Sequence, residues 1–281
     1  MLDDLLLPLV RALPQNAVSR LAGHAAELPL PAVVWHPLIR LFAGSFGVNL
    51  AEAERPVTGY STLADFFARR LKPGLRPLDP DPAALVSPTD GVIRSCGRID
   101  GATLEQIKGI RYSLDTLLLD PDRAGAFRGG SFATFYLSPR DYHRIHAPLD
   151  GRVTGYQYVP GGLLPVNSLT IDRVPGLFTL NERLVAYLDT DAGRVAVVMI
   201  GAMIVGRVRV TFDEVQTNDP GGKMVYGESY DAPVAFERGE ELGSFEFGST
   251  VVLLFERDRV ELDGFDRDAP ILVGQRVGRI L

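Results

Sequence analysis

The sequence predicts an α+β fold in which short amphipathic helices at the N-terminus precede a β-rich core of barrel- or sandwich-like sheets. The chain has 29 glycines and 20 prolines spread along its length, which favours many turns and short strands over long helices. From about residue 85 onward, short apolar and β-branched segments alternate with Gly, Pro and Asp, as in a β-rich body. Helical signals concentrate in the first quarter of the chain.

The first 50 residues are unusually apolar, and prolines interrupt them at positions 8, 14, 29, 31 and 37. Prolines at that density predict short or kinked helices rather than one long rod. No apolar run approaches the roughly 18 to 20 residues of a membrane-spanning helix, and the start Met-Leu-Asp-Asp lacks the positive region of a secretory signal. Such helices suit a membrane interface with Trp35 and the leucines inserted, or packing on the protein's own core or on a second subunit. The residues alone leave these alternatives open.

One further helix and several strands are expected along the chain. Residues 61–65 resemble an N-terminal cap before the apolar segment 66–71, and Pro73 with Gly74 should end that helix. Residues 251–255 are apolar and β-branched, so we expect a strand covered on both faces. Other strands are expected at 131–137, 195–200 and 203–210.

Composition limits the classes of function. A chain of 281 residues with 46% hydrophobic and 23% charged residues is long enough for one sizeable core or two small ones. A formal net charge of −6 argues against nucleic-acid binding, which needs a basic surface. The single cysteine, Cys96, excludes an intrachain disulfide and any multi-cysteine zinc or iron–sulfur site, and it fits a reducing compartment.

A weak internal repeat joins residues 87–92 and 147–153, which share a Pro-x-Asp-Gly turn followed by a β-branched residue. The same motif occurs at the start of the barrel-like sandwich of biotinyl and lipoyl domains, so the sheet is expected to share that architecture. Those carriers need a modifiable lysine on a hairpin, which neither copy supplies. The few lysines (72, 108 and 223) show no apolar Schiff-base setting, which argues against a pyridoxal enzyme.

The densest group of reactive side chains lies in residues 136–148, Tyr-Leu-Ser-Pro-Arg-Asp-Tyr-His-Arg-Ile-His-Ala-Pro. Three interpretations are open: a solvated loop, a metal site, or acid–base chemistry by His143 and His146. A metal would need further ligands that the sequence does not identify. Acid–base work at neutral pH suits imidazole and needs a carboxylate to orient it. Asp90 and Asp150, one in each turn of the repeat, are rival candidates, and spacing does not choose between them.

The sequence Gly248-Ser249-Thr250 interrupts an apolar stretch just before the strand expected at 251–255. Glycine weakens the interior of a strand and often marks a bulge or a close backbone approach. On these residues alone the interruption is a strand entry, unless other parts of the chain give it a chemical role.

Together, the histidine string and the downstream Gly-Ser-Thr make the chain resemble the phosphatidylserine decarboxylases of the membrane-associated bacterial type. Either motif alone would be unspecific. The resemblance covers nearly the whole chain, although Phe247 stands where leucine is usual, at an apolar position beside the motif. Further matching segments are 87–93, 108–114, 158–161, 181–183 and the apolar N-terminal helices.

The resemblance implies a proenzyme that cuts itself between Gly248 and Ser249 into chains 1–248 and 249–281. Ser249 Oγ would attack the Gly248 carbonyl, and elimination and hydrolysis would turn Ser249 into a pyruvoyl group. His146 would be the base that activates Ser249, oriented by Asp90 in preference to Asp150.

In the mature enzyme, the resemblance implies that the pyruvoyl carbonyl forms a Schiff base with the amine of phosphatidylserine and accepts the electrons left by departing CO₂. His143 is then the candidate donor of the proton that completes phosphatidylethanolamine. No pyridoxal phosphate, metal or nucleic acid is expected.

The resemblance also predicts the organisation and the partners. Residues 1–55 are expected to form a membrane-associating helical segment and residues 56–281 the catalytic domain. We expect a homodimer, peripheral on the cytoplasmic face of the inner membrane, in which the two self-cleavage chains stay together. Two alternatives remain: a pyruvoyl decarboxylase of a soluble amino acid, and a non-enzymatic lipoyl-like or membrane-scaffold protein.

Overall fold

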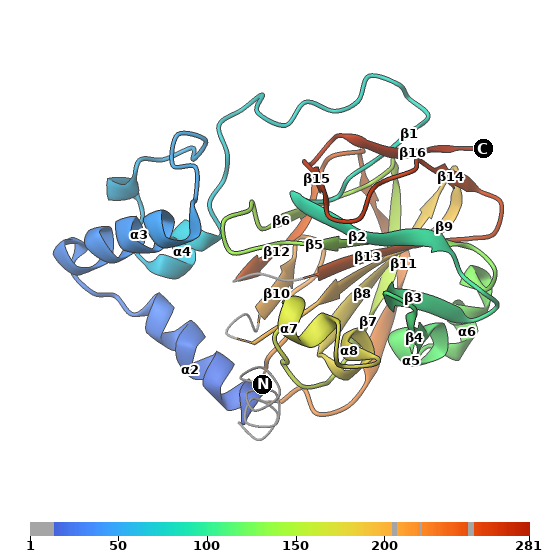
Figure 1. The fold of residues 1–281 in the computed structure, drawn as a ribbon, viewed down its shortest axis with the longest axis horizontal. Helices are drawn as coiled ribbons and strands as arrows, with labels where there is room; N and C mark the ends of the chain where they lie inside the picture. Colours follow the sequence, from blue (N-terminus) through green and yellow to red (C-terminus); the bar gives the residue numbers. More distant parts are fainter. Residues whose placement is uncertain (1–13, 204–206, 220, 247–249) are drawn as a thin grey trace.

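The structure is a computed structural model that describes residues 14–203, 207–219, 221–246 and 250–281. Helices α2, α3 and α4 lie beside a body of sheets, and the extended chain after α4 crosses to strand β1 (Figure 1). The helices are α2 (Gln15–Glu27), α3 (Ala32–Phe46), α4 (Leu63–Phe67), α5 (Leu114–Leu118), α6 (Pro121–Ala124), α7 (Ser168–Ile171) and α8 (Leu177–Leu180), with 3-10 turns η1 (Val57–Gly59) and η2 (Gly125–Phe127).

Within the described part of the chain, eight strands form one antiparallel sheet, two further sheets have three strands each, and β3 and β4 form a hairpin. The large sheet has the order β11 (Tyr226–Phe236), β7 (Gly151–Val159), β8 (Arg183–Thr190), β9 (Gly193–Ile200), β13 (Thr250–Phe255), β5 (Ser131–Tyr136), β2 (Gly91–Arg98), β15 (Ala269–Ile271). The remaining strands are β1 (Ala84–Val86), β16 (Arg276–Ile280) and β14 (Val260–Leu262); β10 (Arg207–Val210), β12 (Glu241–Glu246) and β6 (Arg144–His146); β3 (Thr103–Ile107) and β4 (Ile110–Ser113). The predicted β-rich α+β class is confirmed.

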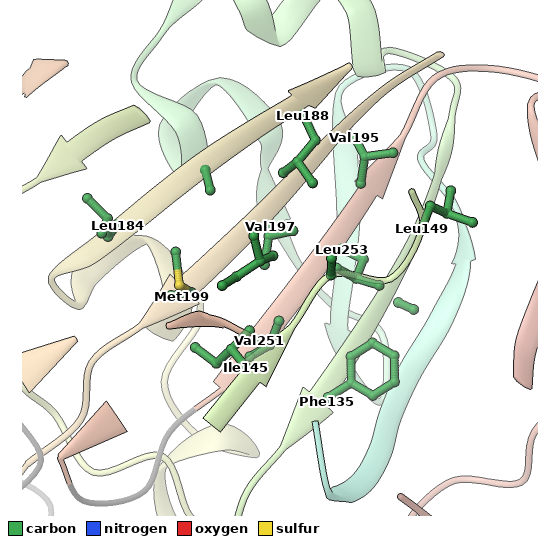
Figure 2. Close-up of a cluster of buried hydrophobic side chains, with 14 of the residues drawn as sticks. Phe135, Ile145, Leu149, Leu184, Leu188, Val195, Val197, Met199, Val251 and Leu253 are labelled. Carbon is green, nitrogen blue, oxygen red and sulfur yellow. The ribbon is translucent and has the colours of Figure 1, made fainter. Parts of the chain in front are cut away.

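Strand β13 lies inside the large sheet, paired on one edge with β5 and on the other with β9, and all six of its residues are buried. Because side chains alternate along a strand, Val252 and Leu254 join one apolar cluster while Val251 and Leu253 join a second on the opposite face. Figure 2 shows the second cluster, with Val251 and Leu253 beside Phe135. The prediction of a strand covered on both faces is confirmed.

Two of the prolines precede the N-terminal helices, whereas Pro37 lies inside α3 and does not end it. Pro14 and Pro31 directly precede α2 and α3, and Gly47 ends α3 in the left-handed conformation, with φ of 74°. Thr62 caps α4 by accepting a hydrogen bond from the backbone N of Asp65, which confirms the predicted cap. The helix ends at Phe67, earlier than expected, because the next residues bind the histidine segment described below.

Trp35 does not lie on the surface as the membrane-interface interpretation expected. It is buried in a cluster with Ile39, Tyr60 and Phe66, and its indole N donates to the carbonyl of Leu28 at 2.8 Å. The apolar surface of these helices is formed by other side chains. No helix in the described ranges is both long enough and apolar enough to cross a membrane.

Candidate active site

The histidine-rich segment connects β5 to β6 and is held in shape by its own Asp141. The backbone N and the hydroxyl of Ser138 both donate to Asp141 Oδ2 at 2.7 Å. The Asp141 carboxylate therefore fixes the loop that carries His143.

Gly248 and Ser249, the predicted cleavage site, lie outside the described residues, but the residues on either side of them bind the histidine segment. The backbone N of Phe245 donates to the carbonyl of His143 at 2.9 Å. Thr250, the first residue of β13, is paired with Tyr136, the last residue of β5. The two flanks of the predicted cleavage site are thus held by the two ends of segment 136–143.

His143 is completely buried, with its ring 4.2 Å from that of Phe67 between centroids. Its Nδ1 donates to the Asp141 carbonyl at 2.8 Å, because a carbonyl oxygen only accepts. Nε2 therefore carries a lone pair, and it has no hydrogen-bond partner among the described residues. Burial lowers the pKa of His143 to about 3. The hydrogen bond to Asp141 raises this pKa, and the charge of Arg69 lowers it further. The imidazole is neutral, so it is a base first and a proton donor only after protonation.

His146 is held in the same tautomer by a different set of partners. Its Nδ1 donates to the carbonyl of Gly239 at 2.7 Å, and its Nε2 accepts from the hydroxyl of Tyr142 at 3.2 Å. Burial lowers the pKa of His146, opposed by the bond to Gly239 and by the charges of Glu241 and Asp90. Nε2 is consequently an oriented acceptor, as a general base requires.

Asp90 is buried, but its carboxylate is bound to Arg76 rather than to a histidine. Arg76 Nε and Nη2 donate to its two oxygens at 2.9 and 2.6 Å, and the backbone N of Val273 donates at 2.9 Å. Arg76 also pairs with Glu52 at 2.8 Å. In the described structure Asp90 makes no hydrogen bond to His146, and it influences that ring only through its charge. The Gly239 carbonyl occupies the position where the sequence predicted a carboxylate.

The Pro-x-Asp-Gly repeat is a structural repeat that places Asp90 and Asp150 in equivalent turns. Asp90 accepts from the backbone N of Val273, and Asp150 accepts from the backbone N of Arg238 at 2.7 Å. The turns also bind each other reciprocally, since the backbone N of residue 86 donates to the carbonyl of 148, and that of 146 to the carbonyl of 88. Asp150 is exposed, whereas Asp90 is buried near His146. The burial of Asp90 near His146 agrees with the preference for Asp90 that the resemblance implies.

The strand register places the two histidines at different distances from the predicted cleavage site. His146 is opposite Glu241 in β12, whereas His143 binds the backbone of Phe245, four residues further along β12. The pairing is irregular between Glu241 and Gly243, and only three residues separate the two histidines, so their positions are at most about 10 Å apart along the strand. The sequence spacing of three residues gave no indication of which histidine lies nearer.

Two small cavities open beside this group. One of about 320 Å³ is lined by His146, Tyr142 and Gly239 together with basic side chains at 70, 72 and 76. The other, about 280 Å³, is lined by Asp90, Arg69 and Arg140, among others. In the described ranges, no three His, Cys, Asp or Glu side chains are grouped so as to hold a metal ion.

Sequence reasoning missed several partners that shape the site. Tyr142 was visible in the string, but nothing in the sequence marks a tyrosine as the partner of His146. Gly239 acts through its backbone carbonyl, which has no residue signature. Arg144 donates to the carbonyl of Ala68 and pairs with Glu241, so it joins the end of α4 to the histidine strand.

Comparisons with known proteins cover nearly all of the chain. A family described as "Phosphatidylserine decarboxylase" matches residues 63–279. The phosphatidylserine decarboxylase proenzyme of Myxococcus xanthus (strain DK1622) is 47% identical over 281 residues, covering 99% of both chains. The corresponding proenzymes of Anaeromyxobacter sp. (strain K) and Brevibacillus brevis (strain 47) are 45% and 42% identical and cover 98% and 96% of both chains. The similarity thus spans the histidine segment and the predicted cleavage site together.

Proposed function

The chain belongs to the phosphatidylserine decarboxylase family, and we propose that it carries out the family's reaction with a pyruvoyl group made from its own Ser249. It is a carboxy-lyase that converts phosphatidylserine to phosphatidylethanolamine and CO₂. Full-length similarity to proenzymes of this name favours the phospholipid substrate over a soluble amino acid and over a non-enzymatic scaffold.

The observation that carries the proposal is the attachment of both flanks of the predicted cleavage site to the histidine segment. Phe245 binds the His143 backbone and Thr250 pairs with Tyr136, so only residues 246–249 separate two fixed points. This arrangement supports a reaction between Ser249 and an imidazole of the same segment.

In the proposed self-cleavage, Ser249 Oγ attacks the carbonyl carbon of Gly248, and an ester replaces the amide as the C–N bond breaks. Removal of the Cα proton of residue 249 then expels chain 1–248 as a carboxylate. Water releases ammonia from the dehydroalanine that remains, which leaves the pyruvoyl group at the start of chain 249–281.

We propose that His146 accepts the proton of the Ser249 hydroxyl, as the resemblance implies. The oriented Nε2 lone pair supports this role, and the Nδ1–H bond to Gly239 holds the ring in the required tautomer. We assign to Asp90 the electrostatic support of the cation that forms on His146, since its charge raises the pKa of that ring.

The buried hydroxyl of Thr250, the next residue after 249, can donate to a carbonyl-containing group, whereas Nε2 of His143 can take up a proton. Thr250 Oγ1 and His143 Nε2 have no hydrogen-bond partner in the part of the chain that the structure describes. The pyruvoyl group would supply an electron sink for the pair left when CO₂ departs. We propose that His143 donates the proton that the product carbon receives. Because the pKa of His143 is low and the ring is neutral, its Nε2 must first take up a proton.

The fold supports the proposal that the two chains remain together after cleavage. All six residues of β13 pair with both β5 and β9, so the 249–281 chain would stay in the middle of the large sheet. We propose a homodimer on the resemblance alone.

We also propose that residues 1–55 associate with the cytoplasmic face of the inner membrane and that residues 56–281 form the catalytic domain. The support is a set of apolar side chains exposed on and beside α2 and α3. Their exposed fractions are 72% for Leu21, 79% for Val33, 66% for Leu41 and 48% for Phe46. Interfacial binding grows with such apolar area.

Processing and turnover of single variants test these assignments separately. Ser249→Ala is expected to remain a single chain without decarboxylase activity, and His146→Ala to remain largely uncut. His143→Ala is expected to be cut but to release CO₂ from phosphatidylserine at least 100-fold more slowly, the usual size of an acid–base contribution. Efficient cleavage of either of the first two variants contradicts the proposed self-processing roles.

A further inference from the structure

Arg69 is a buried arginine whose donors are only partly used. Its side chain lies beside His143, and the residue is 3% exposed. One terminal nitrogen donates to the carbonyls of Arg140 and Asp141 at 2.8 and 3.0 Å. Nε and the other terminal nitrogen have no hydrogen-bond partner among the described residues. A buried cation with two idle donors is costly, which suggests that a ligand completes it.

Arg69 lines the cavity of about 280 Å³ that also contains Asp90, and the carboxylates of that cavity are already engaged. Glu52 and Asp90 pair with Arg76. The Asp141 carboxylate accepts from Ser138 and forms a 3.7 Å pair with Arg140. Within the described ranges, no salt bridge joins Arg69 to a carboxylate, although the charges of the three carboxylates in this cavity act on it. An anion entering the cavity therefore meets a guanidinium with N–H donors to spare.

The rim of the cavity leads to the surface that we propose faces the membrane. Gly47 and Asn49 line it directly after α3. Phe46 and Leu50 flank these residues with exposed fractions of 48% and 39%. A lipid lying on that apolar surface would therefore present its headgroup at the cavity entrance.

We propose that Arg69 binds the phosphodiester of the phosphatidylserine headgroup, an inference that rests on the proposed function. Guanidinium presents two parallel N–H donors that match phosphate oxygens. The serine carboxylate is the weaker candidate, because an ion pair to it would stabilise the charged ground state that must be lost as CO₂. Anchoring the phosphate would leave the headgroup amine and carboxylate on the His143 side.

Two substitutions and a structural control separate binding from loosening of the loop. Arg69→Met removes the charge, and Arg69→Lys keeps the charge without the two-pronged geometry. Arg144→Met is the control, because Arg144 also ties the end of α4 to the histidine segment but uses its donors on Ala68 and Glu241. Each variant is prepared as the self-processed full chain, and its content of hydroxylamine-reactive chain 249–281 is measured first.

The decisive assay is inhibition of phosphatidylserine decarboxylation in detergent by soluble probes. We expect Arg69→Met to raise at least tenfold both the KM for phosphatidylserine and the inhibition constant of glycerophosphoethanolamine. The kcat should change less than threefold. Arg69→Lys should recover part of that loss, and inhibition by free serine should not change. Arg144→Met should leave the glycerophosphoethanolamine constant within threefold of the wild type.

Three results would overturn the proposal: equal losses in Arg69→Met and Arg144→Met, a loss confined to serine, or inorganic phosphate binding as tightly as glycerophosphoethanolamine. If Arg69→Met does not process itself, the test uses Arg69→Lys. We then expect the inhibition constant of glycerophosphoethanolamine to be at least threefold higher than in the wild type. An unchanged inhibition constant would contradict the proposal. Wild-type protein without any reactive ketone would instead refute the proposed function, so the two failures are distinguishable.

Discussion

Replacing His143 by asparagine should make the protein less sensitive to acid. In the folded chain burial lowers the pKa of His143 to about 3, against an ordinary value of 6.5. Between these values the unfolded chain binds a proton that the folded chain does not, so stability is full above pH 6.5 and falls as the pH drops toward 3. At pH 5 the difference of about 1.5 pH units corresponds to about 2 kcal/mol, since one unit is worth about 1.4 kcal/mol.

The assay is urea unfolding at pH 7.5 and pH 5, carried out in the Ser249→Ala background so that a single chain unfolds. Asparagine does not titrate in this range, and its amide can still donate to the Asp141 carbonyl. The His143 form should lose about 2 kcal/mol more than the His143→Asn form between the two pH values. His146 contributes equally to both proteins and cancels. Parallel losses in the two proteins would refute the conclusion that His143 is held neutral by burial.

Three further predictions concern the core and the surface. Arg183 is buried and donates to four backbone carbonyls, so Arg183→Lys should lower the free energy of unfolding by about 3 kcal/mol; a loss below 1 kcal/mol contradicts this. Leu253→Ala should cost about 2–5 kcal/mol in the same urea assay, because Leu253 lies fully buried in the large sheet, and a near-neutral effect would argue against that packing. Val33→Glu with Leu41→Glu should weaken co-sedimentation with phosphatidylglycerol-containing vesicles at least tenfold, whereas Met224→Glu, 77% exposed elsewhere, should not; equal effects would exclude the α3 surface as the contact.

Sequence patterns predicted those features of the fold whose cause is local. The apolar run at 251–255 fixed a strand with both faces covered, and Thr62 marked the start of α4 through its side-chain cap. The shared Pro-x-Asp-Gly motif identified a structural repeat, because a tight turn depends on those few residues.

Features that depend on contacts between distant segments were not predictable. The residues alone left open whether Trp35 lies at a membrane interface or packs on the protein itself, and the structure buries it against Tyr60 and Phe66. The end of α4 at Phe67 depends on Arg69 reaching the carbonyls of residues 140 and 141, about 70 positions later. Hydrogen bonds between such distant segments produce no periodic pattern in the sequence.

The site was predictable in its members but not in their partners. The family resemblance selected Asp90, His143 and His146. The structure places Asp90 near His146, and it places His143 against Phe245, on one flank of the predicted cleavage site. The resemblance did not reveal that the Gly239 carbonyl binds His146, because backbone groups are the same in every residue. It also did not reveal that Arg76 forms an ion pair with Asp90, since ion pairs depend on the folded geometry.

We propose that the active protein consists of two chains held together by strand pairing, the smaller of which begins with a group made from Ser249. Intact-mass measurement of purified material that decarboxylates phosphatidylserine tests it directly. We expect one chain of residues 1–248 and one of residues 249–281, the smaller carrying a ketone whose mass increases by oxime formation with hydroxylamine. Active material consisting only of an uncut 281-residue chain would contradict it.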